Sequence, residues 1–180
     1  MSMNLLLAGF GGQGILFTGK VVAYGGMLDG REVSWLPSYG PEMRGGTANC
    51  SVCVSDSPIG SPLVTAPDVL VAMNLPSLEK FENTVVPGGL IIVDSSIVTE
   101  KVKRDDVKVI YFPATRMASD NGMKGMANMV IAGRLHTETK FCSDESFFEG
   151  IKKSVPARKE GMFEKNVAAV KLGVKYPQLK

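Results

Sequence analysis

The stretch Gly9-Phe10-Gly11-Gly12-Gln13-Gly14 decides the fold, because it joins an apolar run at residues 5–8 to a segment with helical character at residues 13–28. The apolar run predicts a short buried strand. Glycines permit a tight turn and close approach of the backbone to a ligand, and the following helix directs its unpaired N–H groups into the same space. The sequence predicts a turn that either receives an anionic or carbonyl group or only lets strand and helix pack. The candidate ligand-binding residues of the turn are Gly9, Gly11, Gly12, Gln13 and Gly14.

The glycine spacing also satisfies G-x-G-x-x-G, which alone is a weak signal for dinucleotide binding. A dinucleotide site needs an acidic residue at the end of the second strand, roughly 20 residues further on, to hold the ribose hydroxyls. That strand is expected at residues 32–36, and Pro37, Ser38, Tyr39 and Gly40 follow it without an acid. Binding of NAD or FAD is therefore disfavoured.

Residues 37–46, Pro-Ser-Tyr-Gly-Pro-Glu-Met-Arg-Gly-Gly, predict a loop, because their prolines and glycines disfavour helix and central strand. In a parallel sheet this loop leaves the same edge as the glycine turn, so the two are expected to be neighbours. Arg44 can present its guanidinium to a phosphate or carboxylate; the alternative is a surface ion pair with Glu42. The candidate binding residues of this loop are Ser38, Tyr39, Arg44 and Gly45.

The rest of the chain alternates strands and helices, which predicts an α/β fold. Asn74 follows an apolar strand and is a further candidate binding residue at the ligand edge. We expect one domain, residues 1–180, with a Rossmann-like three-layer architecture and a mostly parallel, partly mixed sheet. Further strands are expected at 47–55, 68–73, 90–94 and 107–112, and further helices at 76–81, 123–135, 143–153 and 158–174.

Composition argues against two classes of partner. The chain of 180 residues has a formal net charge of +2, and its basic residues are scattered. This gives no electrostatic case for nucleic acid or a membrane surface. No run approaches the ~20 apolar residues of a membrane span, and a secretory signal pattern is missing from the sequence. The expected location is the cytoplasm.

The three cysteines, Cys50, Cys53 and Cys142, predict neither a disulfide scaffold nor a cluster. Cys50 and Cys53 form C-x-x-C within an expected strand, where residues three apart face opposite sides. A four-thiolate iron–sulfur cluster also needs one more cysteine than the chain has. Buried core cysteines are the favoured interpretation.

The helical C-terminal half offers no catalytic group. The only histidine, His136, lacks companion ligands or a nucleophile. The methionine-rich segment 123–135 predicts core filler or an oligomer contact, and Asn128 within it needs a hydrogen-bond partner if it is buried. On the last helix, Lys165, Asn166 and Lys171 are expected to be exposed.

Two long motifs give the chain a family resemblance. Residues 9–14 and the run Pro-Ser-Tyr-Gly-Pro-Glu-Met-Arg-Gly-Gly-Thr-Ala-Asn at residues 37–49 resemble the gamma subunit of 2-oxoacid:ferredoxin oxidoreductases. The segments 68–74, 88–94 and 128–133 fit the same pattern. The resemblance covers nearly the whole chain, and its second motif is long and specific.

The resemblance implies a complex that oxidatively decarboxylates a 2-oxoacid with coenzyme A to acyl-CoA and carbon dioxide, and passes electrons to ferredoxin. It implies thiamine diphosphate and magnesium in alpha and beta subunits, and iron–sulfur clusters in beta or in a small ferredoxin-like delta subunit. This chain would dock on those subunits and help bind coenzyme A, holding no cofactor tightly itself and inactive alone. A homodimer of the isolated chain stays open, as does the alternative of a free-standing Rossmann-type nucleotide-binding protein. Which 2-oxoacid is oxidised is not encoded in these motifs.

Overall fold

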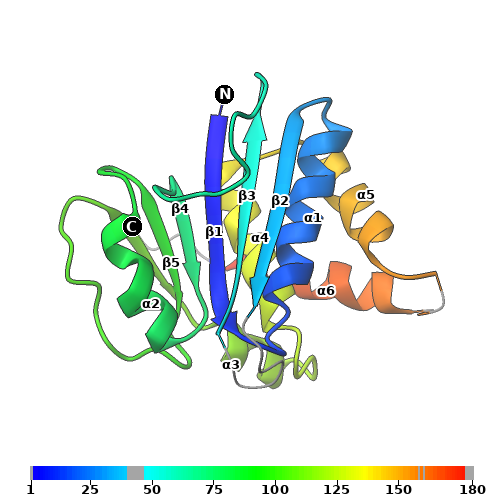
Figure 1. Cartoon of the computed structure of the whole chain (residues 1–180). Coiled ribbons are helices and arrows are strands. Elements are labelled where there is room, and N and C mark those ends of the chain that lie inside the picture. The colour runs from blue at the N-terminus through cyan, green and yellow to red at the C-terminus, as the bar shows by residue number, and fades with distance from the viewer. Residues whose placement is uncertain (1, 40–46, 158, 160, 177–180) are drawn as a thin grey trace.

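The computed structural model describes residues 2–39, 47–157, 159 and 161–176 as an α/β domain (Figure 1). Within those residues one sheet contains all the strands. The strands are β1 (Ser2–Phe10), β2 (Glu32–Tyr39), β3 (Thr47–Ser55), β4 (Val69–Ala72), β5 (Leu90–Asp94) and β6 (Lys108–Phe112). The helices are α1 (Ile15–Leu28), α2 (Leu75–Phe81), the 3-10 helix η1 (Glu82–Thr84), α3 (Ala114–Asp120), α4 (Ala127–Thr139), α5 (Asp144–Ser154) and α6 (Met162–Lys175).

The strand order β2-β3-β1-β4-β5-β6 makes the sheet mixed. Strands β1, β4, β5 and β6 are parallel neighbours, whereas β3 runs antiparallel between β1 and β2. Strand β2 is therefore parallel to β1 but separated from it by β3. The mostly parallel, partly mixed sheet expected from the sequence is confirmed.

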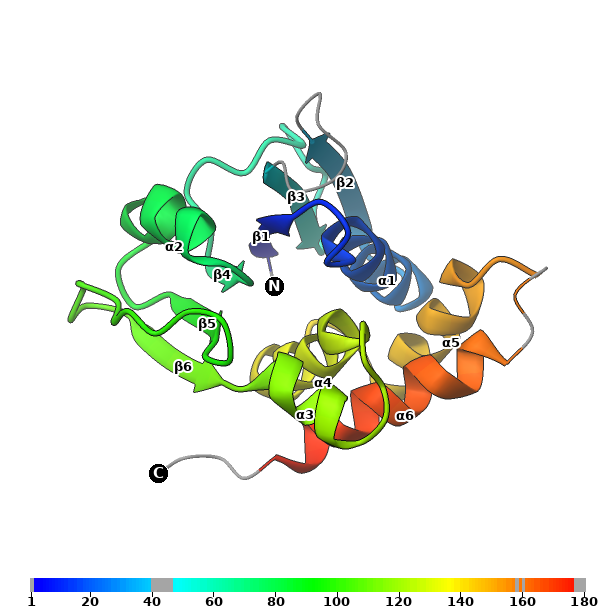
Figure 2. The ribbon, with the colours of Figure 1, turned by 90° about the horizontal axis from the view of Figure 1, so that it is seen from below.

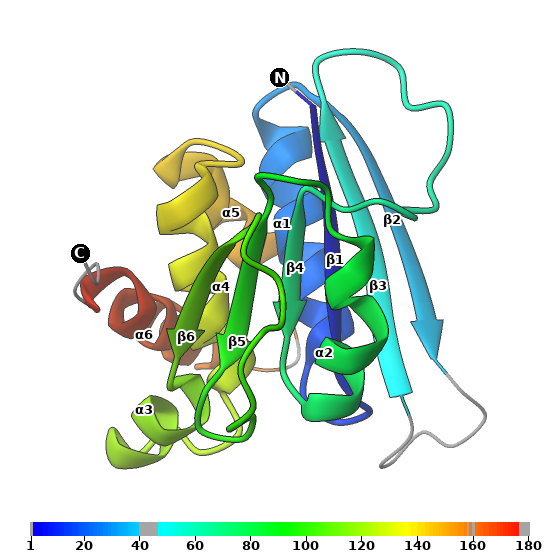
Figure 3. The same cartoon turned by 90° about the vertical axis from the view of Figure 1, so that its left-hand side faces the viewer.

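The sheet is the middle one of three layers, with helices on both of its faces (Figure 3). Helices α1, α4, α5 and α6 cover one face, and α2 covers the other face beside β4 and β5. The alternation of side chains along β1 feeds both cores: Leu5 and Leu7 belong to the larger core under α1 and α4, and Leu6 belongs to the smaller core under α2. The three-layer architecture is confirmed.

One expectation about the second strand is wrong: β2 continues through Pro37 and Ser38 to Tyr39 instead of ending at Leu36. Ser38 pairs with Asn49 across the sheet. Proline is tolerated here because β2 is an edge strand with β3 on one side only, among the described residues. Residues 37–39 of the expected loop thus belong to β2, and residues 40–46 lie outside the described part of the chain.

Small residues set the distances between helices. An added Cβ at Gly173 of α6 would lie 1.9 Å from the carbonyl oxygen of Val130 in α4, and one at Gly133 would lie 2.2 Å from the carbonyl oxygen of Val170. Such contacts exclude any side chain, so α4 and α6 touch backbone to backbone. This contact fixes α6 against α4, and the first turn of α4 contacts the glycine turn through Asn128.

The cysteines are buried and free, as expected. Cys50 faces α1, where its Sγ lies 2.3 Å from the position of a Cβ on Gly19. Cys53 faces the opposite side and contacts the carbonyl oxygen of Ser61 at 3.8 Å. Burial raises the pKa of the Cys50 thiol to about 12, so it stays protonated. The prediction that the two thiols diverge is confirmed.

Helix α1 runs through Gly25 and Gly26 and stops at Leu28, where the helical segment expected at residues 13–28 also ends. One further difference concerns α6. Asn166, expected on an exposed face of α6, is 3% exposed and donates from Nδ2 to the carbonyl oxygen of Met162. Among the described residues, no helix is both long and apolar enough to cross a membrane.

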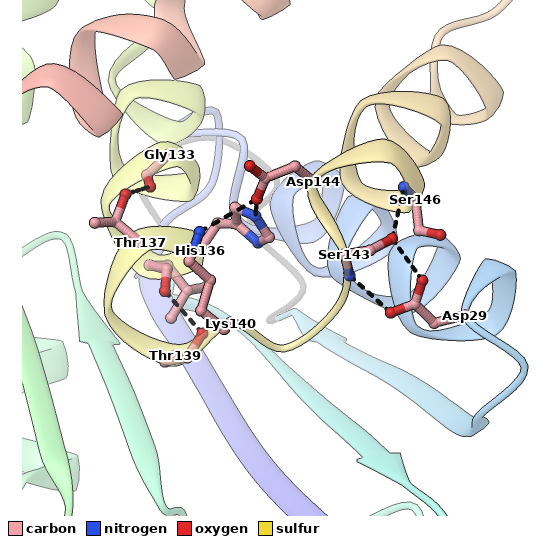
Figure 4. Close-up of polar contacts among 10 residues, drawn as sticks. Asp29, Gly133, His136, Thr137, Thr139, Lys140, Ser143, Asp144 and Ser146 are labelled. Carbon is pink, nitrogen blue, oxygen red and sulfur yellow. Dashed lines mark hydrogen bonds and ion pairs between the residues drawn. The ribbon is translucent and has the colours of Figure 1, made fainter.

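A polar cluster ties the α4–α5 connection together (Figure 4). The Nε2 of His136 lies 2.8 Å from Oδ1 of Asp144, which also lies 3.2 Å from Nζ of Lys140. The imidazole of His136 stacks on the ring of Phe147 at 4.3 Å between centroids. Burial lowers the pKa of His136 and outweighs the neighbouring carboxylate. His136 thus joins α4 to α5 mainly as a neutral imidazole.

Candidate functional site at the glycine turn

The glycine turn begins where β1 ends and is closed by backbone and side-chain hydrogen bonds. The N–H of Gln13 donates to the carbonyl oxygen of Phe10 at 3.1 Å. Gly12 and Gly14 adopt φ values of 96° and 78°, in the left-handed region that glycine accepts without steric cost. The turn thus requires glycine at these two positions for backbone reasons.

Two side chains hold the turn from outside. The Oε1 of Gln13 accepts from the N–H of Phe10 at 2.6 Å, and its Nε2 donates to the carbonyl oxygen of Met73 at 3.0 Å. The Nδ2 of Asn128, in the first turn of α4, donates to the carbonyl oxygen of Gly14 at 3.3 Å. This confirms the expectation that a buried Asn128 has a partner. Gln13 and Asn128 therefore position the backbone.

Helix α1 opens onto this turn without a side-chain cap. Gly14 is its N-cap residue, and the first turn of α1 contains no acidic residue. The first N–H groups of a helix have no partner within the helix and attract negative or carbonyl-type groups. The electrostatic character expected from the sequence is thus present at the start of α1.

A pocket of about 400 Å³ lies beside the turn. Tyr39, at the end of β2, reaches it although β3 separates β1 from β2. Thr47 also reaches it, because antiparallel pairing places Thr47 opposite Phe10. The lining of the pocket is mainly apolar and, among the described residues, contains no charged side chain. The lining residues are Phe10, Gly11, Gly12, Gly14, Ile15, Leu16, Phe17, Tyr39, Thr47 and Ala48.

The structure brings together some of the residues predicted from sequence and separates others. Gly11, Gly12, Gly14 and Tyr39 line the pocket, so the predicted proximity of the turn and the end of β2 is confirmed for Tyr39. Gly9 lies near the end of β1 and is not among the lining residues; an added Cβ there would be 2.6 Å from Oε1 of Gln13. Arg44 and Gly45 lie outside the described residues.

Two candidates stand away from the pocket. Neighbours along a strand face opposite sides, so Ser38 faces away when Tyr39 faces the pocket. Asn74 is completely buried and caps α2, where its Oδ1 accepts from the N–H of Ser77 at 2.8 Å. Capping accounts for an asparagine at this position. Neither residue contacts the space where a ligand would lie.

Sequence reasoning missed the apolar walls of the pocket. Phe17 comes from the first turns of α1, and Thr47 and Ala48 come from the start of β3. The motif at residues 37–49 contained Thr47 and Ala48, but their place depends on β3 running antiparallel beside β1. An apolar residue three positions after Gly14 was the available signal for Phe17.

An apolar strip continues from this pocket along α1 and the edge strand β2. Trp35, Met27 and Tyr39 are 39%, 50% and 60% exposed. A second hollow, of about 270 Å³, lies between α1 and β2 and is lined by Lys20, Ala23, Tyr24, Met27, Val33 and Trp35. We call Phe17, Tyr24, Met27, Trp35 and Tyr39 the α1–β2 face. Exposed aromatic and methionine side chains beside an unpaired strand edge are typical of an interaction surface.

The sequence of the described fold has a clear family match. The family model described as "Pyruvate ferredoxin/flavodoxin oxidoreductase" matches residues 4–176. The chain belongs to the pyruvate ferredoxin/flavodoxin oxidoreductase family. This confirms the resemblance seen in the motifs at residues 9–14 and 37–49.

Two curated members of this family show how the chain relates to complete proteins. The 2-oxoglutarate synthase subunit KorC of Methanocaldococcus jannaschii is 38% identical over 176 residues, covering 96% of this chain and 92% of that protein. The ketoisovalerate oxidoreductase subunit VorA of Methanothermobacter thermautotrophicus is 40% identical over 175 residues, covering 97% of this chain. The chain spans only 36% of VorA, so this domain occurs both separately and within longer family members.

Solved structures of family members share the fold. The gamma subunit of a keto/oxoacid ferredoxin oxidoreductase from Geobacter sulfurreducens superposes with a TM-score of 0.82 at 27% identity, covering 96% of both chains. A 2-oxoglutarate:ferredoxin oxidoreductase from Magnetococcus marinus, solved with 2-oxoglutarate, coenzyme A and succinyl-CoA, has a TM-score of 0.86 at 22% identity, covering 98% of this chain and 32% of that one. The second likeness establishes the fold alone.

Proposed function

We propose that this chain is the gamma subunit of a complex that oxidatively decarboxylates a 2-oxoacid with coenzyme A. The observation that carries the proposal is the family match over residues 4–176, together with a relative of equal extent, KorC. Thiamine diphosphate, magnesium and iron–sulfur clusters would be held by alpha, beta and ferredoxin-like subunits. Among the described residues, no group of three or more His, Cys, Asp or Glu side chains is arranged to hold a metal ion.

The α1–β2 face is the proposed docking surface for the catalytic subunits. Its occupant is inferred from VorA, of which this chain matches 36%, so that a similar domain is covalently joined there to a longer polypeptide. Trp35 and Tyr39 lie on the edge strand, and Met27 of α1 lines the same hollow as Trp35. Aromatic residues and methionine are enriched in protein interfaces. Docking here would cover the outer edge of β2.

The glycine-turn pocket is the proposed contact with coenzyme A. Its walls suit an apolar part of the ligand, and the uncapped start of α1 suits a carbonyl or phosphate group. Arg44 and Gly45, which lie outside the described residues, would supply a charge-assisted contact. Arg44→Ala is then expected to raise the apparent KM for coenzyme A with the complex still assembled, whereas loss of this chain from the complex would assign Arg44 to docking.

Sheet topology counts against the alternative of a free-standing dinucleotide-binding enzyme. In that class the strand beside β1 is parallel to it and ends in the acid that holds the ribose. Here the neighbour on that side is the antiparallel β3, which begins at Thr47 at this edge. Strand β2 ends in Pro37, Ser38 and Tyr39, without an acid. The described sheet therefore lacks the ribose-binding position.

Co-purification tests the proposal. The chain, tagged and expressed with alpha and beta subunits from the same organism, is expected to elute with them and to support 2-oxoacid- and coenzyme A-dependent reduction of ferredoxin or a viologen dye. A matched binding series with NAD, FAD and coenzyme A on the isolated chain separates the alternative. Tight binding of NAD or FAD without any partner subunit would overturn the proposal.

A further inference from the structure

The hollow between α1 and β2 is built from one stripe of a helix and one face of a strand. Its α1 residues recur at the spacing i, i+3, i+4 and i+7, which places them on one helix face, and its β2 residues alternate along the strand. Figure 2, a view from below, shows α1 beside β2 at the end of the sheet, whereas α4 and α6 lie away from β2. The hollow has a volume of about 270 Å³, and its lining residues are Lys20, Ala23, Tyr24, Met27, Val33 and Trp35.

Two glycines of α1 fix the walls of this hollow. An added Cβ at Gly19 would lie 3.1 Å from Nε1 of Trp35, and one at Gly26 would lie 3.1 Å from Cγ2 of Val33. Both distances are shorter than ordinary van der Waals contacts, so α1 packs on these β2 side chains with little room for a side chain of its own. The hollow is therefore formed by the packed fold itself.

The size of the hollow suits protein side chains. Pockets for cofactors and other small molecules usually measure about 300–1,000 Å³, and this hollow is smaller than that range. Two of its lining residues, Met27 and Trp35, are 50% and 39% exposed. A large apolar side chain from another protein would cover them, and the residues that dominate binding at interfaces commonly fill such pockets.

Lys20 is the one charged residue in the described lining, and it is half-buried. Its Nζ lies 5.6 Å from the centroid of the Tyr24 ring, within the range of a cation–π contact. Among the described residues Lys20 forms no ion pair. A partner that covers the α1–β2 face would take this ammonium group out of water, which is costly unless a carboxylate pairs with it. Charge complementarity thus calls for an acidic group on the partner beside the apolar side chain.

The outer edge of β2 is a poor template for the addition of a strand. Pro37 lies within β2 and has no N–H to donate. Proline on an edge strand is one of the features that discourage pairing with another chain. The partner is therefore expected to contact the side chains of the α1–β2 face instead of pairing with the backbone at its edge.

We propose that the hollow receives a large apolar side chain of the catalytic subunits, and that Lys20 pairs with a carboxylate next to that side chain. The partner segment is therefore both apolar and acidic. This inference rests on the docking surface proposed above and adds the chemistry of the segment that occupies it.

The test is the affinity of the full chain for purified alpha and beta subunits, measured at about 50 mM and about 300 mM KCl, on either side of physiological ionic strength. Lys20→Glu reverses the charge in the hollow, and Lys20→Met removes the charge but keeps an apolar stem. Lys165→Glu is the control, because Lys165 is exposed on α6, outside the α1–β2 face. Unfolding midpoints verify that each variant is folded.

Lys20→Glu is expected to raise the Kd at the lower salt concentration at least about tenfold, because like charges across an interface repel. Lys20→Met is expected to bind with a shallower salt dependence than the wild type, and Lys165→Glu is expected to match the wild type. This pattern supports the proposal.

Equal Kd values for Lys20→Glu and Lys165→Glu overturn the proposal but not the gamma-subunit function, because the wild type still binds. Failure of the wild-type chain to bind the catalytic subunits overturns both. Sedimentation of the isolated chain tests the other occupant: self-association that Lys20→Glu abolishes would assign the hollow to a second copy of this chain, which also overturns the proposal.

Discussion

The side chain of Gln13 joins the glycine turn to the neighbouring strand, because its Nε2 donates to the carbonyl oxygen of Met73 at 3.0 Å while its Oε1 accepts from the N–H of Phe10. Met73 directly follows β4, the parallel neighbour of β1. One side-chain amide therefore pairs with a backbone N–H at the end of β1 and with a backbone carbonyl just after β4. These hydrogen bonds within the protein hold the turn in its shape.

Gln13→Ala is expected to destabilise the protein by about 1–3 kcal/mol, because a partly buried donor and acceptor lose their partner. The measurement is urea unfolding. Asn121→Ala is the matched control, since the exposed Asn121 amide bonds only to the carbonyl oxygen of Met117 in its own helix. Equal destabilisation by the two substitutions would contradict the role given to Gln13.

Gly12→Ala isolates the backbone requirement of the turn. Nothing lies within 4 Å of an added Cβ at Gly12, yet its φ is 96°. The cost should therefore come from conformation alone, about 1–2 kcal/mol of unfolding free energy. Gly60→Ala is the control, because Gly60 also has open space but no positive φ. If Gly12→Ala is as well tolerated as Gly60→Ala, the left-handed turn is not required.

The stability of the protein is expected to decline as pH falls below about 6.5, the usual pKa of histidine in an unfolded chain. Burial lowers the pKa of His136 in the folded state. The unfolded chain then takes up a proton that the folded protein does not, which favours unfolding as the pH falls. Once the pH is below the folded-state pKa, this contribution stays constant.

The slope of unfolding free energy between about pH 7 and about pH 5 measures this effect. His136→Phe, which keeps an aromatic ring against Phe147, should flatten the slope. Asp144→Asn should not flatten the slope, because the loss of the neighbouring carboxylate lowers the pKa of His136 further. The pKa of Asp144 is itself lowered by its hydrogen bond with His136, so its contribution is lost only at lower pH. A slope unchanged by His136→Phe would refute the assignment.

The sequence predicted the strands and their order along the chain, but not the direction of β3. Buried parallel strands read as continuous apolar runs, whereas antiparallel strands usually alternate. Strand β3 is nearly continuously buried, because helix α1 covers one face and the segment with Ser61 and Val64 covers the other. Its pattern thus gave no sign of direction.

The candidate site was predicted in part for the same reason. Tyr39 was found because the carboxyl ends of β1 and β2 lie at one edge, and this holds even with β3 between them. Ser38 was grouped with it because residues 38 and 39 were expected in a loop, whereas both belong to β2, and neighbours along a strand face opposite sides. Asn74 was placed at the correct edge but acts as a helix cap.

The α1–β2 face gives a direct prediction for assembly. Trp35→Ser should weaken docking on the catalytic subunits, because buried tryptophans often dominate interface energies, at about 2 kcal/mol or more each. The measurement is the fraction of this chain retained when tagged alpha and beta subunits are purified. Leu63→Ser is the control, since Leu63 is 59% exposed and lies outside this face. Equal retention of both variants would place the interface elsewhere.

The central claim is that the chain works as a subunit of a 2-oxoacid oxidoreductase, and omission with add-back tests it most directly. Alpha and beta subunits, with any small ferredoxin-like subunit, are purified without this chain and assayed for 2-oxoacid- and coenzyme A-dependent acyl-CoA formation before and after the pure chain is added. Little activity is expected before addition, and after addition the activity is expected to saturate at a fixed ratio of this chain to the others. Full acyl-CoA formation without the chain, unchanged by its addition, would contradict the account.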